Sequence, residues 1–108
     1  MNYVINIKNL RNSKPAAPND IRVDRANKVL GNQFYMADES MRDEVCDLYQ
    51  VWFDKKVESK DPEVMTELRR LWKIWKEYGT LNLYCWCAPK RCHAQTIRDF
   101  LLKFPPKQ

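Results

Sequence analysis

The chain has 108 residues, 44% of them hydrophobic and 31% charged, and 19 Lys and Arg against 14 Asp and Glu give a formal charge of +5. This length supports one hydrophobic core, and the composition excludes a disordered chain, which buries too little, and a membrane-embedded one, which is far more apolar. No stretch approaches the roughly 20 apolar residues that span a bilayer, and the first residues lack a secretory signal, so we expect a cytoplasmic protein without membrane contact.

The N-terminal third predicts two strands and two loops. The segment 3–7 is short and rich in β-branched side chains, which favours a strand. Residues 9–20 hold the Asn, Ser and Pro side chains typical of a loop. Residues 21–25 alternate apolar and charged side chains, the period of a half-buried strand. Residues 26–39 show no period and contain Gly31, one of only two glycines, beside an aromatic residue. Such a loop can bring backbone close to a ligand.

Two long amphipathic helices are predicted for the middle of the chain. The first is expected at about 41–57, with Ser40 as its N-cap. The second has Asp61 as its cap and Pro62 at its first helical position, and it ends at Gly79. The core-facing stripes are Val45, Leu48, Tyr49 and Trp52 in the first helix and Val64, Leu68, Leu71, Trp72 and Trp75 in the second.

The C-terminal part predicts a strand and a final helix. The segment 81–87 is short and rich in residues with high strand propensity, and it ends before Pro89, which favours a central strand. A last amphipathic helix before Pro105 is indicated by Ile97, Phe100, Leu101 and Phe104. The order β-β-α-α-β-α over residues 1–108 predicts a single small α/β domain with a three- to four-stranded sheet covered by about three helices.

The most informative segment is Cys85-Trp86-Cys87-Ala88-Pro89-Lys90-Arg91-Cys92-His93, at a strand–loop–helix junction. Strand carboxyl ends and free helix N–H groups converge at such junctions and gather ligand-binding groups. One interpretation makes Cys92 or Cys87 a nucleophile, because a helix start and nearby basic residues lower a thiol pKa, with His93, the only histidine, as acid or base. The alternative is that the cysteines are small buried hydrophobes.

Two further interpretations of this segment have less support. The side chains of Cys85, Cys87, Cys92 and His93 form a Cys₃His set suited to zinc, but all four belong to one knuckle with Cys-x-Cys spacing, so we expect no cofactor. The Cys-x₅-Arg spacing matches a phosphatase loop, in which backbone N–H groups wrap a phosphate. Such loops need glycine, and there is none between residues 80 and 108.

A pocket for nucleotide-like ligands is the remaining interpretation. It would be formed by the 25–34 and 86–93 loops at one end of the sheet, with basic groups for phosphates and aromatic rings for stacking. The expected ligand-binding residues are Arg25, Lys28, Gly31, Asn32, Phe34, Trp86, Cys87 and Pro89, with Tyr35 as a further aromatic ring and with Cys92 and His93 as the catalytic pair. We therefore expect a protein that binds or processes a nucleotide-like or other phosphorylated small molecule. The alternative is a non-enzymatic interaction module that binds a nucleic acid or a host protein.

Several groups of residues follow a pattern shared with other proteins: Asn6-Ile7-Lys8, Arg25, Gly31-Asn32-x-Phe34 and the Cys-Trp-Cys segment ending at His93. In this pattern the chain resembles a small domain family of unknown function found in bacteria and their phages. The resemblance implies the same fold over nearly the whole chain, a site at the last two motifs, and a phage-encoded protein in the cytoplasm of a bacterial host. Gln33 replaces the family's Pro. Ala94-Gln95 replaces its Gly and acidic residue, which disfavours any mechanism that needs the acid.

Overall fold

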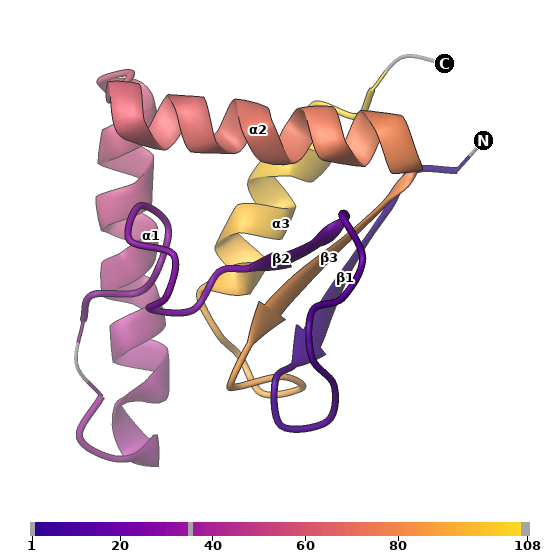
Figure 1. Cartoon of the computed structure of the whole chain (residues 1–108). Coiled ribbons are helices and arrows are strands. Elements are labelled where there is room, and N and C mark those ends of the chain that lie inside the picture. The colour runs from indigo at the N-terminus through magenta and orange to yellow at the C-terminus, as the bar shows by residue number, and fades with distance from the viewer. Residues whose placement is uncertain (1, 35, 107–108) are drawn as a thin grey trace.

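The computed structural model describes residues 2–34 and 36–106, and Figure 1 shows the arrangement of the chain. Its strands are β1 (Val4–Asn9), β2 (Asp20–Arg22) and β3 (Thr80–Cys85). Its helices are the short 3₁₀ turn η1 (Glu39–Met41), α1 (Arg42–Glu58), α2 (Pro62–Tyr78) and α3 (Ala94–Leu102). The predicted small α/β domain and its element order are confirmed, and the sheet of the described residues has three strands.

The three strands are parallel, and β3 lies between β1 and β2. Ile5 pairs with Leu81, and both Ile7 and Ile21 pair with Leu83, so one face of the sheet is apolar across all three strands. This face forms the hydrophobic core together with the buried residues of the helices. Period-2 alternation in each strand produces that single apolar face.

The opposite face of the sheet carries a polar chain of hydrogen bonds across all three strands. The Asn6 amide donates to Asn82 Oδ1 at 3.1 Å, and the Asn82 amide donates to Asp20 Oδ1 at 2.8 Å. Asp20 Oδ2 accepts from the backbone N–H groups of Ala16 and Ala17, at 3.0 and 2.9 Å. These bonds fix the strand register and anchor the loop before β2.

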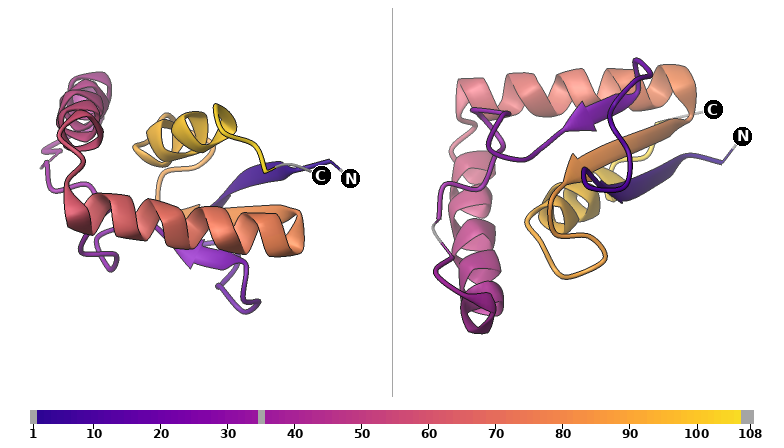
Figure 2. Two further views of the ribbon diagram at one scale, coloured as in Figure 1. Left: turned by 90° about the horizontal axis from the view of Figure 1, so that it is seen from above. Right: turned by 60° about the horizontal axis from the view of Figure 1, so that its bottom comes forward.

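Helices α2 and α3 pack against the sheet, and α1 meets α2 in an L-shaped corner at one side of it (Figures 1 and 2). Helix α2 follows its sequence signals closely: Asp61 Oδ2 accepts from the Val64 N–H at 3.1 Å, and Gly79 ends the helix at φ 76°. Its buried residues are Val64, Leu68, Leu71 and Trp75. The caps and the apolar stripe therefore explain both the length and the orientation of this helix.

The start and the inner face of α1 differ from the prediction. Asp38, not Ser40, caps the turn that leads into the helix, because its carboxylate accepts from the Ser40 N–H at 2.8 Å. Leu48 is 45% exposed, and Phe53 takes its place in the core. The buried residues of α1 are Val45, Cys46, Tyr49 and Phe53. Val45 and Tyr49 therefore face the core as predicted, Cys46 and Phe53 complete this face, and Trp52 is only partly buried.

None of the helices among the described residues is both long enough and apolar enough to span a membrane.

Candidate functional site

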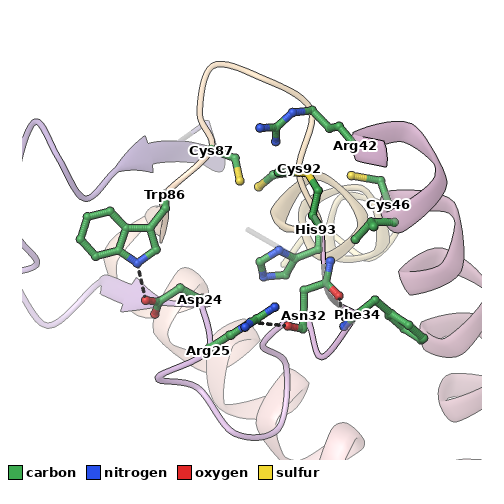
Figure 3. A pocket seen from close by; sticks show the side chains of 12 residues that line it. Asp24, Arg25, Asn32, Phe34, Arg42, Cys46, Trp86, Cys87, Cys92 and His93 are labelled. Carbon is green, nitrogen blue, oxygen red and sulfur yellow. Dashed lines mark hydrogen bonds between the residues drawn. The ribbon is translucent and has the colours of Figure 1, made fainter. Parts of the chain in front are cut away.

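The ends of β2 and β3 lie at the same edge of the parallel sheet, and the segments that follow them enclose a cavity of about 380 Å³ (Figure 3). The start of α1 closes its third side. Of the predicted site residues, the cavity is lined by Arg25, Asn32, Phe34, Trp86, Cys87, Cys92 and His93. The sequence-predicted loops at 25–34 and 86–93 therefore meet in one cavity.

The other predicted residues lie elsewhere. Lys28 and Pro89 are exposed and do not line the cavity. Gly31 also lies outside the lining and has a backbone role, because a Cβ at this position would come within 2.5 Å of the Asn27 carbonyl oxygen. Tyr35 lies outside the described residues.

The 25–34 loop is held in place by Asn27. Its Oδ1 accepts from the N–H groups of Val29 and Leu30 at 3.1 and 2.9 Å, and its amide donates to Glu67 at 2.8 Å. The Gly31 N–H then donates to the Asn27 carbonyl at 2.8 Å, which closes the turn. A compact turn of this kind presents the side chains on either side of it in fixed positions.

Arg25 is the basic group that reaches into the cavity from this loop. Its Nε donates to the Asn32 carbonyl oxygen at 3.2 Å. Within residues 2–34 and 36–106 the guanidinium forms no ion pair with a carboxylate. Its two terminal nitrogens therefore remain as donors for an anionic ligand.

Trp86 forms the opposite wall and is anchored through its polar edge. Its Nε1 donates to Asp24 Oδ2 at 2.8 Å, and Arg22 donates to both oxygens of the same carboxylate, at 3.0 and 2.6 Å. Burial would raise the pKa of Asp24, but the bonds from Arg22 and Trp86 outweigh burial and hold it below its usual value. The ionised carboxylate thereby fixes the indole, which remains 50% exposed.

Cys87 and Cys92 line the inner wall of the cavity, and the buried Cys85 contacts Cys92 from the core. Cys92 Sγ lies 3.2 Å from Cys85 Sγ and also points toward the Cys87 sulfur, so its one S–H group is shared between these two acceptors (Figure 3). Hydrogen bonding from Cys92 lowers the pKa of Cys87, and the Arg42 guanidinium beside it acts in the same direction, against the effect of burial. The pKa of Cys92 is raised, because its neighbours favour the protonated donor. These contacts favour Cys87 over Cys92 as the thiolate of this site.

His93 is buried and bonds to backbone. Its Nε2 lies within hydrogen-bond distance of the Val23 carbonyl oxygen, and the ring packs edge-on against Tyr49 with centroids 5.0 Å apart. Because a carbonyl only accepts, Nε2 carries the proton and Nδ1 of the neutral ring is an acceptor. Burial lowers the pKa of His93, which favours the neutral ring near pH 7.

The predicted zinc set is separated by these contacts. The ring of His93 is directed to a backbone carbonyl, whereas the cysteine sulfurs contact one another. Over the described part of the chain, no group of three or more His, Cys, Asp or Glu side chains has the geometry to hold a metal ion.

Sequence reasoning missed five residues that line the cavity: Asp24, Met36, Arg42, Val45 and Cys46. Asp24 had a local indication, since it stands directly before Arg25 at the end of a predicted strand. The position of Arg42 depends on how α1 docks. Its guanidinium is held by Glu39 at 2.7 and 2.6 Å and by the Arg91 carbonyl at 2.9 Å. No pattern within α1 itself predicts these contacts.

Comparison with known proteins gives one match. The family model DUF4326, a domain of unknown function, matches residues 5–103. No curated protein and no solved structure matches the chain.

Proposed function

We propose that this chain, which belongs to the DUF4326 family of domains of unknown function, binds a nucleotide-like or other phosphorylated small molecule in the cavity between the two loops. One observation carries the proposal: an unpaired guanidinium, Arg25, and an exposed indole, Trp86, line one cavity. Its volume of about 380 Å³ lies within the roughly 300–1,000 Å³ typical of small-molecule sites.

The apolar part of the cavity suits a planar ring. Phe34, Met36 and Val45 contribute apolar lining, and Trp86 presents its indole in a fixed orientation. Stacking of a base on an aromatic side chain contributes about 1–3 kcal/mol, with little dependence on which base is bound. An aromatic or heterocyclic group would therefore be bound between these side chains.

The charged part of the cavity suits a phosphate. Arg42 uses both terminal nitrogens and its Nε in bonds to Glu39 and to the Arg91 carbonyl, whereas Arg25 uses only its Nε. Among the residues that the structure describes, Arg25 is therefore the arginine of this cavity with both terminal nitrogens free of such bonds and available for an anion. A guanidinium binds two phosphate oxygens in a planar, forked arrangement. The phosphate of the ligand would therefore lie at Arg25, with the ring directed toward Trp86.

Proton transfer to or from the bound ligand would involve His93, whose Nδ1 is the acceptor on a neutral ring. Of the two cysteines predicted as nucleophiles, Cys87 is favoured over Cys92, because it is the more exposed and lies beside Arg42. The family resemblance suggests a phage-encoded protein in the cytoplasm of a bacterial host, and the four free cysteines agree with a reducing compartment.

Calorimetry with a panel of nucleotides, NAD and sugar phosphates tests the proposal. For a ligand that binds, Arg25→Gln should weaken affinity about tenfold or more, since hydrogen bonds to charged groups contribute about 1.5–3 kcal/mol. Lys28→Gln is the matched control, because it removes the same charge from the same loop but outside the cavity. If folded protein responds to none of these compounds, or if both variants lose affinity equally, the proposal fails.

The second candidate is a non-enzymatic module that binds a nucleic acid or a host protein. It predicts that partner binding survives Cys92→Ser and His93→Ala in folded protein but is lost when a basic face is reversed in charge. Together with the calorimetric panel, this outcome separates the two classes.

A further inference from the structure

The three clustered cysteines, Cys85, Cys87 and Cys92, differ sharply in their access to solvent. Cys85 is 1% exposed and Cys92 is 4% exposed, whereas Cys87 is half-buried and lines the cavity. A small reagent that enters the cavity therefore meets Cys87 first. Cys92 also borders the cavity but is almost fully buried, and its sulfur is directed at that of Cys87 (Figure 3).

The 86–93 loop brings these two cysteines together. The Asn9 amide, at the end of β1, donates to the Ala88 carbonyl at 2.6 Å, and the Lys90 N–H donates to the Cys87 carbonyl at 2.9 Å. The Ala94 N–H donates to the Cys92 sulfur at 3.3 Å and holds this thiol at the start of α3. Both sulfurs are thus positioned by backbone contacts on either side of the loop.

Arg42 supplies the charge for nucleophilic attack. Its guanidinium lies beside Cys87 and is itself held by Glu39 at 2.7 and 2.6 Å, so it does not need to reorganise during the reaction. A fixed cation stabilises a thiolate, and it also stabilises the negative charge that develops on a departing hydroxide.

We propose that Cys87 and Cys92 form a peroxide-reactive dithiol, with Cys87 as the attacking thiolate and Cys92 as the resolving thiol. The Cys87 sulfur attacks one oxygen of hydrogen peroxide, the O–O bond breaks, and the departing hydroxide takes up a proton to become water. Cys87 is then a sulfenic acid. The Cys92 sulfur attacks the Cys87 sulfur, the S–O bond breaks, and the hydroxide leaves as water with the Cys92 proton, which gives a disulfide.

In this sequence two thiols are oxidised and one peroxide is reduced to two waters. The reaction goes beyond the proposed ligand binding and does not depend on it, so either proposal can fail alone. The competing pair is Cys85 and Cys92, whose sulfurs are 3.2 Å apart. Both of these are buried, so neither can serve as the first point of attack.

Intact mass and non-reducing peptide mapping of the full reduced chain, after one equivalent of hydrogen peroxide, test the proposal. The wild-type chain should lose the mass of two hydrogens and form a disulfide. Cys87→Ser should form none. Cys92→Ser should stop at a sulfenic acid on Cys87, detected as a dimedone adduct. Cys92→Ala is a second variant that avoids placing a hydroxyl in the buried position.

Cys85→Ser and Cys46→Ser are the matched controls, and both should retain the Cys87–Cys92 disulfide. A disulfide that survives Cys87→Ser and disappears in Cys85→Ser would overturn the proposal, since the buried pair would then be the reactive one. Unchanged mass of the wild-type chain would also overturn it, as would oxidation of Cys87 to a sulfinic acid without a disulfide.

Discussion

The indole nitrogen of Trp86 donates to the carboxylate of Asp24 at 2.8 Å, and this bond joins the loop after β3 to the loop after β2. Arg22 donates two hydrogen bonds to the same carboxylate. Asp24 is only 7% exposed, so the Arg22 guanidinium and the N–H groups of Trp86 and Ala26 take the place of water around its charge. The two sides of the cavity are therefore coupled through one buried carboxylate.

Asp24→Asn should destabilise the fold at neutral pH by about 1–3 kcal/mol, because it leaves polar partners of a buried group poorly satisfied. The folded-state pKa of Asp24 is lowered, so its contribution is present above the ordinary Asp value of 3.8 and is lost as the pH falls through the folded-state pKa. Urea unfolding at several pH values should therefore show a difference between wild type and variant that shrinks in acid. Asp99→Asn, on the exposed face of α3, is the control and should have little effect. A pH-independent difference would contradict this assignment.

His93 should titrate below the ordinary value of 6.5, because burial disfavours the charged ring. The unfolded chain then binds more protons than the folded one, so stability should decrease as the pH falls from 6.5 toward the folded-state pKa. Since the chain has one histidine, a single imidazole resonance followed by NMR reports this pKa directly. A midpoint at or above 6.5 would show that the ring is not held as described.

Gly31→Ala should destabilise the protein by about 1–3 kcal/mol, since an added methyl group would overlap backbone that cannot easily move. The new Cβ would lie 2.5 Å from the Asn27 carbonyl oxygen and 2.6 Å from that of Asp24. Chemical denaturation measures the effect. Gln33→Ala, two positions along the same loop and exposed, should change stability by less than about 0.5 kcal/mol. Equal behaviour of the two variants would mean that the close approach at Gly31 is relieved without cost.

Asp61→Ala should lower the free energy of unfolding by about 0.5–2 kcal/mol, because it removes the side chain that caps α2. The lost bond runs from the Val64 N–H to the Asp61 carboxylate at 3.1 Å. Thermal or urea unfolding followed by circular dichroism measures the loss. Asp61→Asn should retain most of the stability, since an amide oxygen still accepts from this N–H group. A loss as large as that of the alanine variant would assign the effect to charge instead of capping.

The fold could be predicted from the sequence where the capping residues of an element and its apolar stripe indicate the same structure. Asp61, Pro62 and Gly79 bound α2 as predicted, and the apolar stripe between them reaches the core. The strands were predicted in the right order along the chain, but their bounds were wrong. Asp20–Arg22 is shorter than the expected 21–25. The Val23 N–H still donates to the Tyr84 carbonyl of β3 at 3.0 Å, but the Val23 carbonyl bonds to His93, and Asp24 and Arg25 line the cavity. Where a strand ends depends on its pairing with the neighbouring strand, and the local sequence pattern does not contain that information.

The candidate site was predictable as far as topology determines it. Parallel strands carry their carboxyl ends to one edge, and this alone placed the loops after β2 and β3 together. Side chains contributed by α1 were not predictable, because the docking of a helix depends on tertiary packing. Tertiary packing also explains why the prediction of Lys28 as a ligand-binding residue did not hold for the cavity. Lys28 looks equivalent to Arg25 in sequence, but it lies on the outer side of the turn that Asn27 closes.

The central strand is also the last strand in the chain, and this has a consequence for synthesis on the ribosome. Asn82 bonds to Asn6, 76 residues before it, and to Asp20, 62 residues before it. While the chain emerges, β1 and β2 have no neighbour to pair with, and both remain unpaired edges until β3 has left the exit tunnel. The sheet, the cavity and the cysteine segment therefore assemble in a single late event, after the helices α1 and α2 have already been made.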